Sequence, residues 1–241
     1  MMDNFKPKMR VVNPDSAGLN SFFKRVYSYM TMALLVTAGT AYLGATIFRA
    51  QIIAIFSSGI SQLALIAVMF GIVWMFSRRV LQNPAQAFGM LMGYAVINGV
   101  FFSTIGLMFN LSTIAAALLT TALLFAGMAV YGFTTKRSMA SMGAILFGGV
   151  IALIIGGIIN IFFFNSIVFL FLSVVGVIVF ALLTAYDMNR LKTMYNEYGG
   201  QGQATVEQGL AVSGALSLYM DFINLFIYIL RLFSVFGGSR N

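Results

Sequence analysis

Two acidic residues, Asp187 and Asp221, stand in or at the ends of long apolar stretches of the sequence. A charged side chain at the centre of a bilayer costs at least about 2.5–3.5 kcal/mol, so an acid in such a stretch usually binds an ion or relays a proton. The chain has six acidic residues. The other four lie in polar segments: Asp3, Asp15, Glu197 and Glu207. Asp187 and Asp221 are therefore the strongest candidates for functional residues.

Polar residues around Asp221 recur at steps of three or four. Because an α-helix has 3.6 residues per turn, side chains at these steps share one face. The face consists of Gly214, Ser217, Asp221, Asn224, Tyr228 and Arg231. The rest of this segment is apolar, which predicts that the polar face points into a helical bundle or a water-filled cavity.

Asp187 directly follows an apolar run and is itself followed by polar residues. One interpretation is an interfacial carboxylate that pairs with Arg190 three residues further along the helix. However, no helix breaker appears before Gly199 and Gly200. We therefore expect the helix to continue past Asp187, which places this residue about one turn inside the cytoplasmic surface.

The two carboxyl groups could meet in the inner half of the membrane. Asp221 lies about eleven residues into its segment, or ~16 Å at the rise of an α-helix. Two carboxyl groups in contact and partly desolvated do not both ionise easily, so such a pair titrates as a unit. The chain has no histidine, and the pair would supply the pH sensitivity that histidine usually provides.

The composition excludes a soluble protein. The 241 residues are 60% hydrophobic and 8% charged, whereas soluble domains carry roughly 25% charged residues. The chain also has no cysteine, which with the absence of histidine excludes disulfides, Cys/His metal sites and His-dependent catalytic triads. We expect a polytopic membrane protein in contact with the lipid bilayer and without a cofactor.

Seven apolar segments are long enough to cross ~30 Å of hydrocarbon. They cover residues 27–48, 60–76, 88–109, 114–133, 142–164, 167–186 and 210–233. Every backbone polar group in lipid must be satisfied within its own segment, so these runs must be helices. The fold class predicted is an all-α integral membrane protein with seven transmembrane helices.

The connections between these segments add detail. Residues 52–56 are also apolar, and residues 57–59 are either a loop or part of a longer tilted helix. Two links are very short, at 110–113 and 165–166. Short links predict that the helices they join are antiparallel neighbours. This applies to 88–109 with 114–133, and to 142–164 with 167–186.

Lysine and arginine predict the orientation. Eleven of the 14 basic residues fall on the side of the N-terminus, namely Lys6, Lys8, Arg10, Lys24, Arg25, Arg78, Arg79, Lys136, Arg137, Arg190 and Lys192. The opposite side has Arg49, Arg231 and Arg240. Basic residues accumulate on the cytoplasmic side. We expect a cytoplasmic tail (1–25), a transmembrane domain (26–235) and a short external tail (236–241). The net charge of +8 does not indicate nucleic-acid binding, because the basic residues flank the apolar segments and form no separate basic domain.

Three motifs resemble one known family. Residues 185–192 (AYDMNRLK) and 215–226 (ALSLYMDFINLF) closely resemble two signatures of the Bax inhibitor-1 family, also called the transmembrane Bax-inhibitor-motif group, and of its bacterial members in particular. Residues 131–137 (YGFTTKR) resemble the family's segment after the fourth helix. The resemblance extends over the chain from about Ser21 onward.

The resemblance implies a fold in which the seventh helix is central within a bundle of six. It also implies a pH-dependent, calcium-permeable leak in the bacterial inner membrane, governed by a di-aspartyl pair that corresponds to Asp187 and Asp221. Family members have a basic residue near the cytoplasmic end of the second helix that contacts the pair. Arg78 is the best candidate for this latch here, although it lies about a turn later than the family pattern, and Arg190 is the local alternative.

Calcium takes six to eight oxygen ligands, so two aspartates with Ser217, Asn224 and Tyr228 nearby predict weak and transient binding. Weak binding suits conduction, because a permeant ion must also leave. The alternative function is an interaction protein that modulates a membrane-bound ATP-dependent protease, with residues 196–208 as the docking segment. We do not expect an enzyme, because Asp221 is preceded by Leu218, Tyr219 and Met220 and not by the Gly-x-Gly turn of intramembrane aspartyl proteases, and the Pro-Ala-Leu motif of those enzymes is absent.

Overall fold

The computed structural model describes residues 16–163, 165–198 and 204–237, and these residues form eight helices. The helices are α1 (Ser16–Thr46), α2 (Arg49–Ser57), α3 (Gly59–Arg79), α4 (Pro84–Met108), α5 (Leu111–Thr134), α6 (Met142–Phe163), α7 (Ser166–Tyr198) and α8 (Ala204–Gly237). All except α2 are long and apolar enough to cross a membrane. The predicted all-α fold with seven spans is confirmed.

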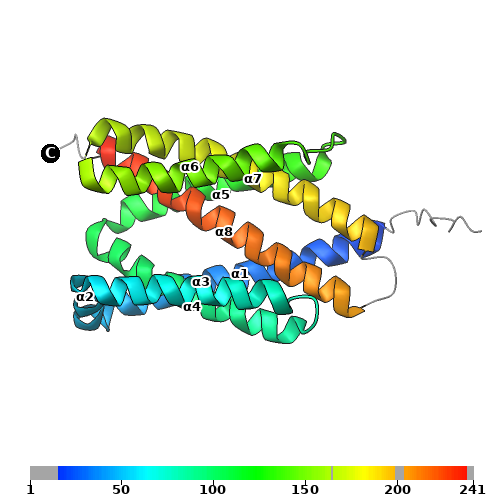
Figure 1. Cartoon of the computed structure of the whole chain (residues 1–241), viewed down its shortest axis with the longest axis horizontal. Helices are drawn as coiled ribbons and strands as arrows, with labels where there is room; N and C mark the ends of the chain where they lie inside the picture. Colours follow the sequence, from blue (N-terminus) through cyan, green and yellow to red (C-terminus); the bar gives the residue numbers. More distant parts are fainter. Residues whose placement is uncertain (1–15, 164, 199–203, 238–241) are drawn as a thin grey trace, which may run out of the picture.

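The last helix, α8, forms the centre of the bundle. In its most apolar stretch 72% of the residues are buried, against 6–33% in the other six spans. It packs against α1, α4, α5 and α7, whereas α3 packs mainly on α4, and α6 on α7. In Figure 1, α8 crosses diagonally between a group formed by α1, α3 and α4 and a group formed by α5, α6 and α7. The expected central position of the seventh span is confirmed.

One helix boundary differs from the prediction and another agrees with it. Helix α1 begins at Ser16 rather than near residue 27, because Phe22 is fully buried and packs on Tyr195 of α7, with 4.9 Å between the ring centroids. Residues 16–25 therefore belong to the bundle and not to a tail. Helix α7 continues to Tyr198, so the prediction that it extends past Asp187 is confirmed.

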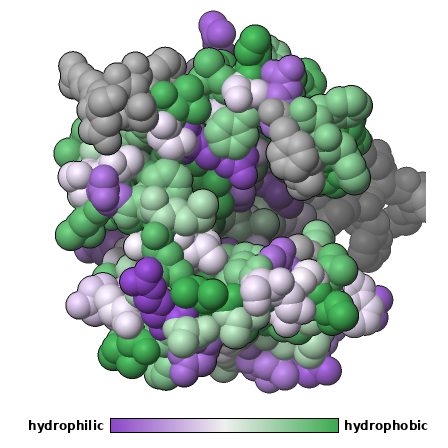
Figure 2. Space-filling view, turned by 90° about the vertical axis from the view of Figure 1, so that its left-hand side faces the viewer, coloured by the Kyte–Doolittle hydropathy of each residue, from purple (hydrophilic) through white to green (hydrophobic). Residues whose placement is uncertain are grey.

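Of the two alternatives for residues 57–59, the longer continuous helix is wrong, because the chain is interrupted at Ser58, between α2 and α3. The apolar residues 52–56 belong to the separate nine-residue helix α2, which ends where Ser58 adopts an extended conformation with φ −103° and ψ 119°. Among its residues Ile52 is buried. Figure 2 looks onto this end of the molecule, where hydrophilic and hydrophobic side chains are interspersed and the surface is recessed between the two groups of helices.

One of the two predicted antiparallel neighbours is wrong. Helices α6 and α7 pack together as expected, but α5 packs along α7 and α8 rather than along α4. The link between α4 and α5 consists of Phe109 and Asn110, both extended, with φ/ψ of −119°/146° and −67°/145°. Two consecutive extended residues direct α5 away from α4, so a short link does not by itself make a packed hairpin.

Candidate functional site

The interface of α7 and α8 carries both acidic candidates, and glycines bring the two helices close. A Cβ on Gly214 would lie 2.6 Å from Leu191 Cδ2, and a Cβ on Gly176 would lie 2.5 Å from the Tyr228 ring. Small residues of this kind let transmembrane helices approach closely. Because the approach occurs at both ends of the shared length, the side chains between these glycines face a narrow interface.

Asp221 lies in the middle of α8 and its side chain is 5% exposed. Its Oδ2 atom is buried and has no hydrogen-bond partner in the part of the chain that the structure describes. A buried polar atom without a partner costs roughly 1–3 kcal/mol, and more when it is charged. Such atoms are rare in native structures, and each one therefore calls for an explanation.

Asp187 is half-buried on α7 and faces Asp221. The side chain of Ser217 forms a hydrogen bond with its carboxyl group, and the positive charge of Arg190 acts on it. The charge of Asp187 in turn acts on Asp221. The structure therefore brings together four of the predicted residues: the carboxyl groups of Asp187 and Asp221, the hydroxyl group of Ser217 and the guanidinium group of Arg190.

The remaining residues of the polar face lie further along α8, towards its C-terminus. Asn224 is half-buried, and its Nδ2 atom donates a hydrogen bond to the Met220 carbonyl oxygen at 2.8 Å. The Tyr228 ring stacks on Phe180 of α7 at a centroid distance of 5.7 Å. Of the polar face, Ser217 is the residue that the structure shows bonded to the acidic pair, while Tyr228 closes the α7–α8 interface nearer to the other end of the bundle.

The two candidates for the basic latch lie in different places. Arg190 is on α7, one turn after Asp187, and it is the arginine whose charge acts on that residue. The Arg78 guanidinium lies over the Trp74 ring of its own helix, 3.9 Å from the ring centroid. Helix α3 packs on α2 and α4. The structure therefore brings Arg190 to the acidic pair and leaves Arg78 on the outer face of α3.

A set of hydrogen bonds that joins α5 to α7 was not predicted, although the two sequence segments that form it were both identified as motifs. Lys192 donates from Nζ to the Phe133 carbonyl oxygen at 2.8 Å, and Asn189 donates from Nδ2 to the Gly132 carbonyl oxygen at 3.4 Å. A side chain at Gly132 would overlap the backbone of Ala185. The motif 131–137 thus docks onto the motif 185–192 and fixes the helical turn that carries Asp187.

A second anchor was missed because its residues lie far apart in the sequence. Thr37 of α1 donates from Oγ1 to the Ala95 carbonyl oxygen at 3.0 Å, and its hydroxyl lies 2.7 Å from the Tyr219 hydroxyl. Since the Thr37 hydrogen is used, Tyr219 donates in the second bond. Tyr219 is fully buried. It ties α8 to α1 and α4, and so sets the rotation of α8 that turns Asp221 towards α7.

The site does not form a dedicated metal cage. Within the described ranges, no group of three or more Asp, Glu, His or Cys residues could hold a metal ion. Asp187 and Asp221 offer carboxylate oxygens, and the Asn224 carbonyl oxygen lies one turn away along α8. Oxygen ligands of this kind suit a hard cation such as calcium, in a site with few protein ligands.

Comparison with known proteins gives consistent results over nearly the whole chain. Residues 19–238 match the family described as inhibitor of apoptosis-promoting Bax1. The chain is 37% identical to the protein YrjE of Lactococcus lactis over 228 residues, which covers 94% of this chain and 95% of YrjE. It is 33% identical to the inner membrane protein YbhL of Escherichia coli over 240 residues, which covers 99% of this chain and 100% of YbhL.

Proposed function

Because the chain belongs to the Bax inhibitor-1 family of multi-span membrane proteins, we propose that it is a pH-sensitive cation leak, with calcium as the main ion. Asp187 and Asp221 are the site at which the ion and the proton compete. The protein is not an enzyme in this proposal. It resides in a bacterial inner membrane, which is the location that the name of the E. coli relative gives for that protein. Its N-terminus lies in the cytoplasm in this proposal, as the distribution of basic residues predicts.

The buried Oδ2 atom of Asp221 is the observation that carries this proposal. A carboxylate kept only to hold two helices together would use both oxygens in hydrogen bonds, since an unpaired oxygen in the interior is unfavourable. Asp221 instead leaves one oxygen without a protein donor beside a second carboxyl group. A proton shared by the pair, or a bound cation, would provide the missing partner for this oxygen atom.

Competition between proton and cation gives the pH dependence. When the pair holds a proton, its charge is reduced and its attraction for calcium falls. When both groups are ionised, they attract a cation, and Arg190 is the cation that the protein itself provides. A bridge from Arg190 to the carboxylates would hold the cytoplasmic mouth of the α7–α8 interface closed, and protonation would weaken that bridge.

Flux through reconstituted protein tests the proposal. Purified protein in liposomes is assayed for calcium entry at about pH 6, 7 and 8, which spans the range in which a carboxyl pair in this setting can titrate. We expect flux through the wild-type protein to change with pH. The double variant Asp187→Asn/Asp221→Asn should give a pH-independent flux. Potassium in place of calcium in the same assay determines whether calcium is preferred.

Glu207→Gln is the matched control, because Glu207 is also a carboxylate of α8 but pairs with Arg25, at 3.6 Å, away from the acidic pair. It should keep the wild-type pH profile. If the folded double variant also keeps this profile, the di-aspartyl site is not the sensor. The alternative role, modulation of a membrane-bound protease, would then be the better hypothesis. Its expected docking segment, 196–208, includes residues 199–203, which lie outside the described residues.

A further inference from the structure

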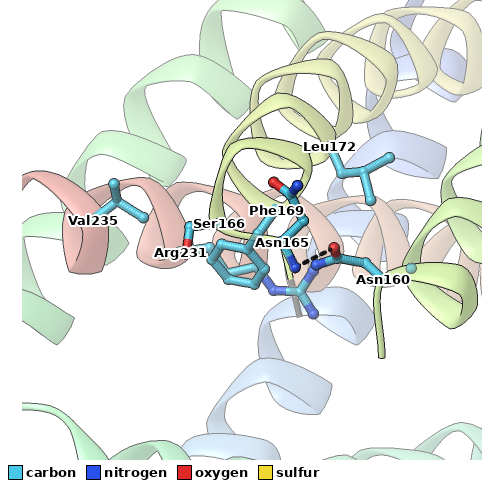
Figure 3. A pocket seen from close by; sticks show the side chains of 8 residues that line it. Asn160, Asn165, Ser166, Phe169, Leu172, Arg231 and Val235 are labelled. Carbon is cyan, nitrogen blue, oxygen red and sulfur yellow. Dashed lines mark hydrogen bonds between the residues drawn. The ribbon is translucent and has the colours of Figure 1, made fainter. Parts of the chain in front are cut away.

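A cavity of about 620 Å³ opens at the end of the bundle opposite the cytoplasmic motifs. It is lined by Gly157 and Asn160 of α6, Asn165 of the following link, Ser166, Phe169 and Leu172 of α7, and Arg231 and Val235 of α8. Figure 3 shows these side chains around the Arg231 guanidinium. The volume falls in the range of about 300–1,000 Å³ that is usual for ligand pockets.

Arg231 gives the cavity a positive charge without an acidic partner. Its guanidinium carbon lies 5.5 Å from the centroid of the Phe169 ring and 5.2 Å from that of Tyr228. Two aromatic rings at this distance hold a guanidinium in place. The ion pair between Arg25 and Glu207 does not involve this cavity, because neither residue lines it. The connections at this end of the bundle contain no Asp or Glu.

The neutral polar groups of the cavity are arranged as donors. Asn160 uses its Oδ1 atom to accept the Asn165 backbone N–H at 3.1 Å. Asn165 uses its Oδ1 atom to accept the N–H groups of Ile167 and Val168, at 2.9 and 3.1 Å. These bonds fix the orientation of both amides and leave their Nδ2 groups to donate. A guanidinium and two amide donors together suit an oxyanion.

The depth of Arg231 indicates which oxyanion. Arg231 lies ten residues after Asp221, which is about 15 Å along the helix. Arg231 shares its cavity with Asn165 of the link between α6 and α7 and with Ser166, the first residue of α7. It therefore lies at the level where the chain turns between two spans, and this is the level at which lipid phosphates lie. Arginine matches the geometry of phosphate groups by forming paired hydrogen bonds.

We propose that this cavity binds a phosphate group, with Arg231 as its principal ligand, and that the phosphate belongs to an anionic phospholipid of the outer leaflet. This site is separate from the acidic pair and does not depend on the leak function. A free phosphate ion would satisfy the same donors, so the experiment must distinguish the two sources.

Native mass spectrometry of the purified full-length protein with added phosphatidylglycerol measures lipid binding directly. We expect one lipid to be retained by the wild-type protein, and Arg231→Gln to weaken its binding about tenfold or more, as for the loss of a charged hydrogen bond. Arg231→Lys, which keeps the charge but not the planar fork, should give an intermediate value. Inorganic phosphate is tested in parallel through its effect on thermal stability.

Arg49→Gln is the matched control. Arg49 is the exposed first residue of α2 and does not line the cavity. Helix α2 lies at the same end of the bundle as the C-terminal end of α8 (Figure 1). The Arg49→Gln variant should bind the lipid as tightly as the wild-type protein does. Stabilisation by inorganic phosphate alone, lost in the Arg231 variants, would support the phosphate site but overturn its assignment to a lipid. If folded Arg231→Gln and Arg231→Lys proteins bind both probes as tightly as the wild type, the site does not exist.

Discussion

At the scale of single residues, the acidic pair differs from the rest of the polar face of α8. Ser217 bonds to Asp187, and Asn224 bonds to its own helix. Asp221 alone has a buried oxygen atom for which the described residues offer no donor. The pair is therefore asymmetric, with Asp187 held by Ser217 and Arg190 and with Asp221 available to a proton or an ion.

This asymmetry predicts different effects of the single variants. Asp221→Asn should reduce calcium flux about tenfold or more, because it removes a charged ligand of the ion. Asp187→Asn should reduce the flux less, since loss of the Arg190 bridge opposes loss of ion affinity. Both variants should show a blunted pH profile in the liposome assay. Equal flux through the wild-type protein and a folded Asp221→Asn variant would exclude Asp221 from the ion pathway.

Tyr219 should contribute to stability through its hydroxyl group. Tyr219→Phe removes the 2.7 Å bond to Thr37, but Thr37 still donates to Ala95, so the expected loss is one ordinary hydrogen bond, about 0.5–1.5 kcal/mol. Denaturation in detergent measures the difference in the free energy of unfolding. Tyr131→Phe is the control, because Tyr131 is exposed, and it should change stability by less than about 0.5 kcal/mol. Equal stability of the two variants would contradict the anchor.

At the scale of the elements, the contact between α5 and α7 depends on the absence of a side chain at one position. Gly132 lies against the backbone of Ala185, two residues before Asp187. Backbone atoms cannot move aside as a flexible side chain can. Together with the bonds from Asn189 and Lys192, this contact fixes the position of α7 at the depth of the acidic pair.

Gly132→Ala should therefore destabilise the protein by about 1–3 kcal/mol, as overpacking does. Gly127→Ala is the matched control on the same helix, because a Cβ at Gly127 would have nothing within 4 Å. It should be neutral or stabilising by up to about 1 kcal/mol, since alanine favours the helix. Thermal unfolding of both variants in detergent measures the contrast. Similar melting temperatures for the two variants would show that α5 and α7 are less tightly joined than the structure indicates.

At the scale of the whole molecule, the basic residues and the seven spans predict the orientation. Eleven of 14 lysines and arginines belong to the side that carries the N-terminus. Eight of these eleven residues lie in the part of the chain that the structure describes, and one of them, Arg25, pairs with Glu207 of α8. Lys6, Lys8, Arg10 and Arg240 lie outside the described residues.

Reporter fusions test this orientation. A fusion at Gly200, between α7 and α8, should give a cytoplasmic signal, and a fusion at the C-terminus should give an external one, because an odd number of spans separates the ends of the chain. A fusion between α6 and α7 should also be external. The same signal at Gly200 and at the C-terminus would contradict the topology and with it the assignment of the acidic pair to the cytoplasmic half.

The sequence by itself determined the number of spans, their helical nature, the polar face of α8 and the two acidic candidates. These features depend on local properties, since the length and hydropathy of a segment decide whether it crosses the membrane. The continuation of α7 past Asp187 was predictable for the same reason, because only the absence of a helix breaker was needed.

Only the tertiary structure decided which helix faces lie together. Apolar faces are nearly equivalent in lipid, so lateral packing depends on close backbone approach and on hydrogen bonds between distant residues. For this reason the sequence did not reveal the direction of α5, the Thr37–Tyr219 anchor, or the choice of Arg190 over Arg78 as the neighbour of Asp187. The Arg231 cavity likewise arises only where α6, α7 and α8 meet, because it combines three segments whose proximity no local pattern encodes.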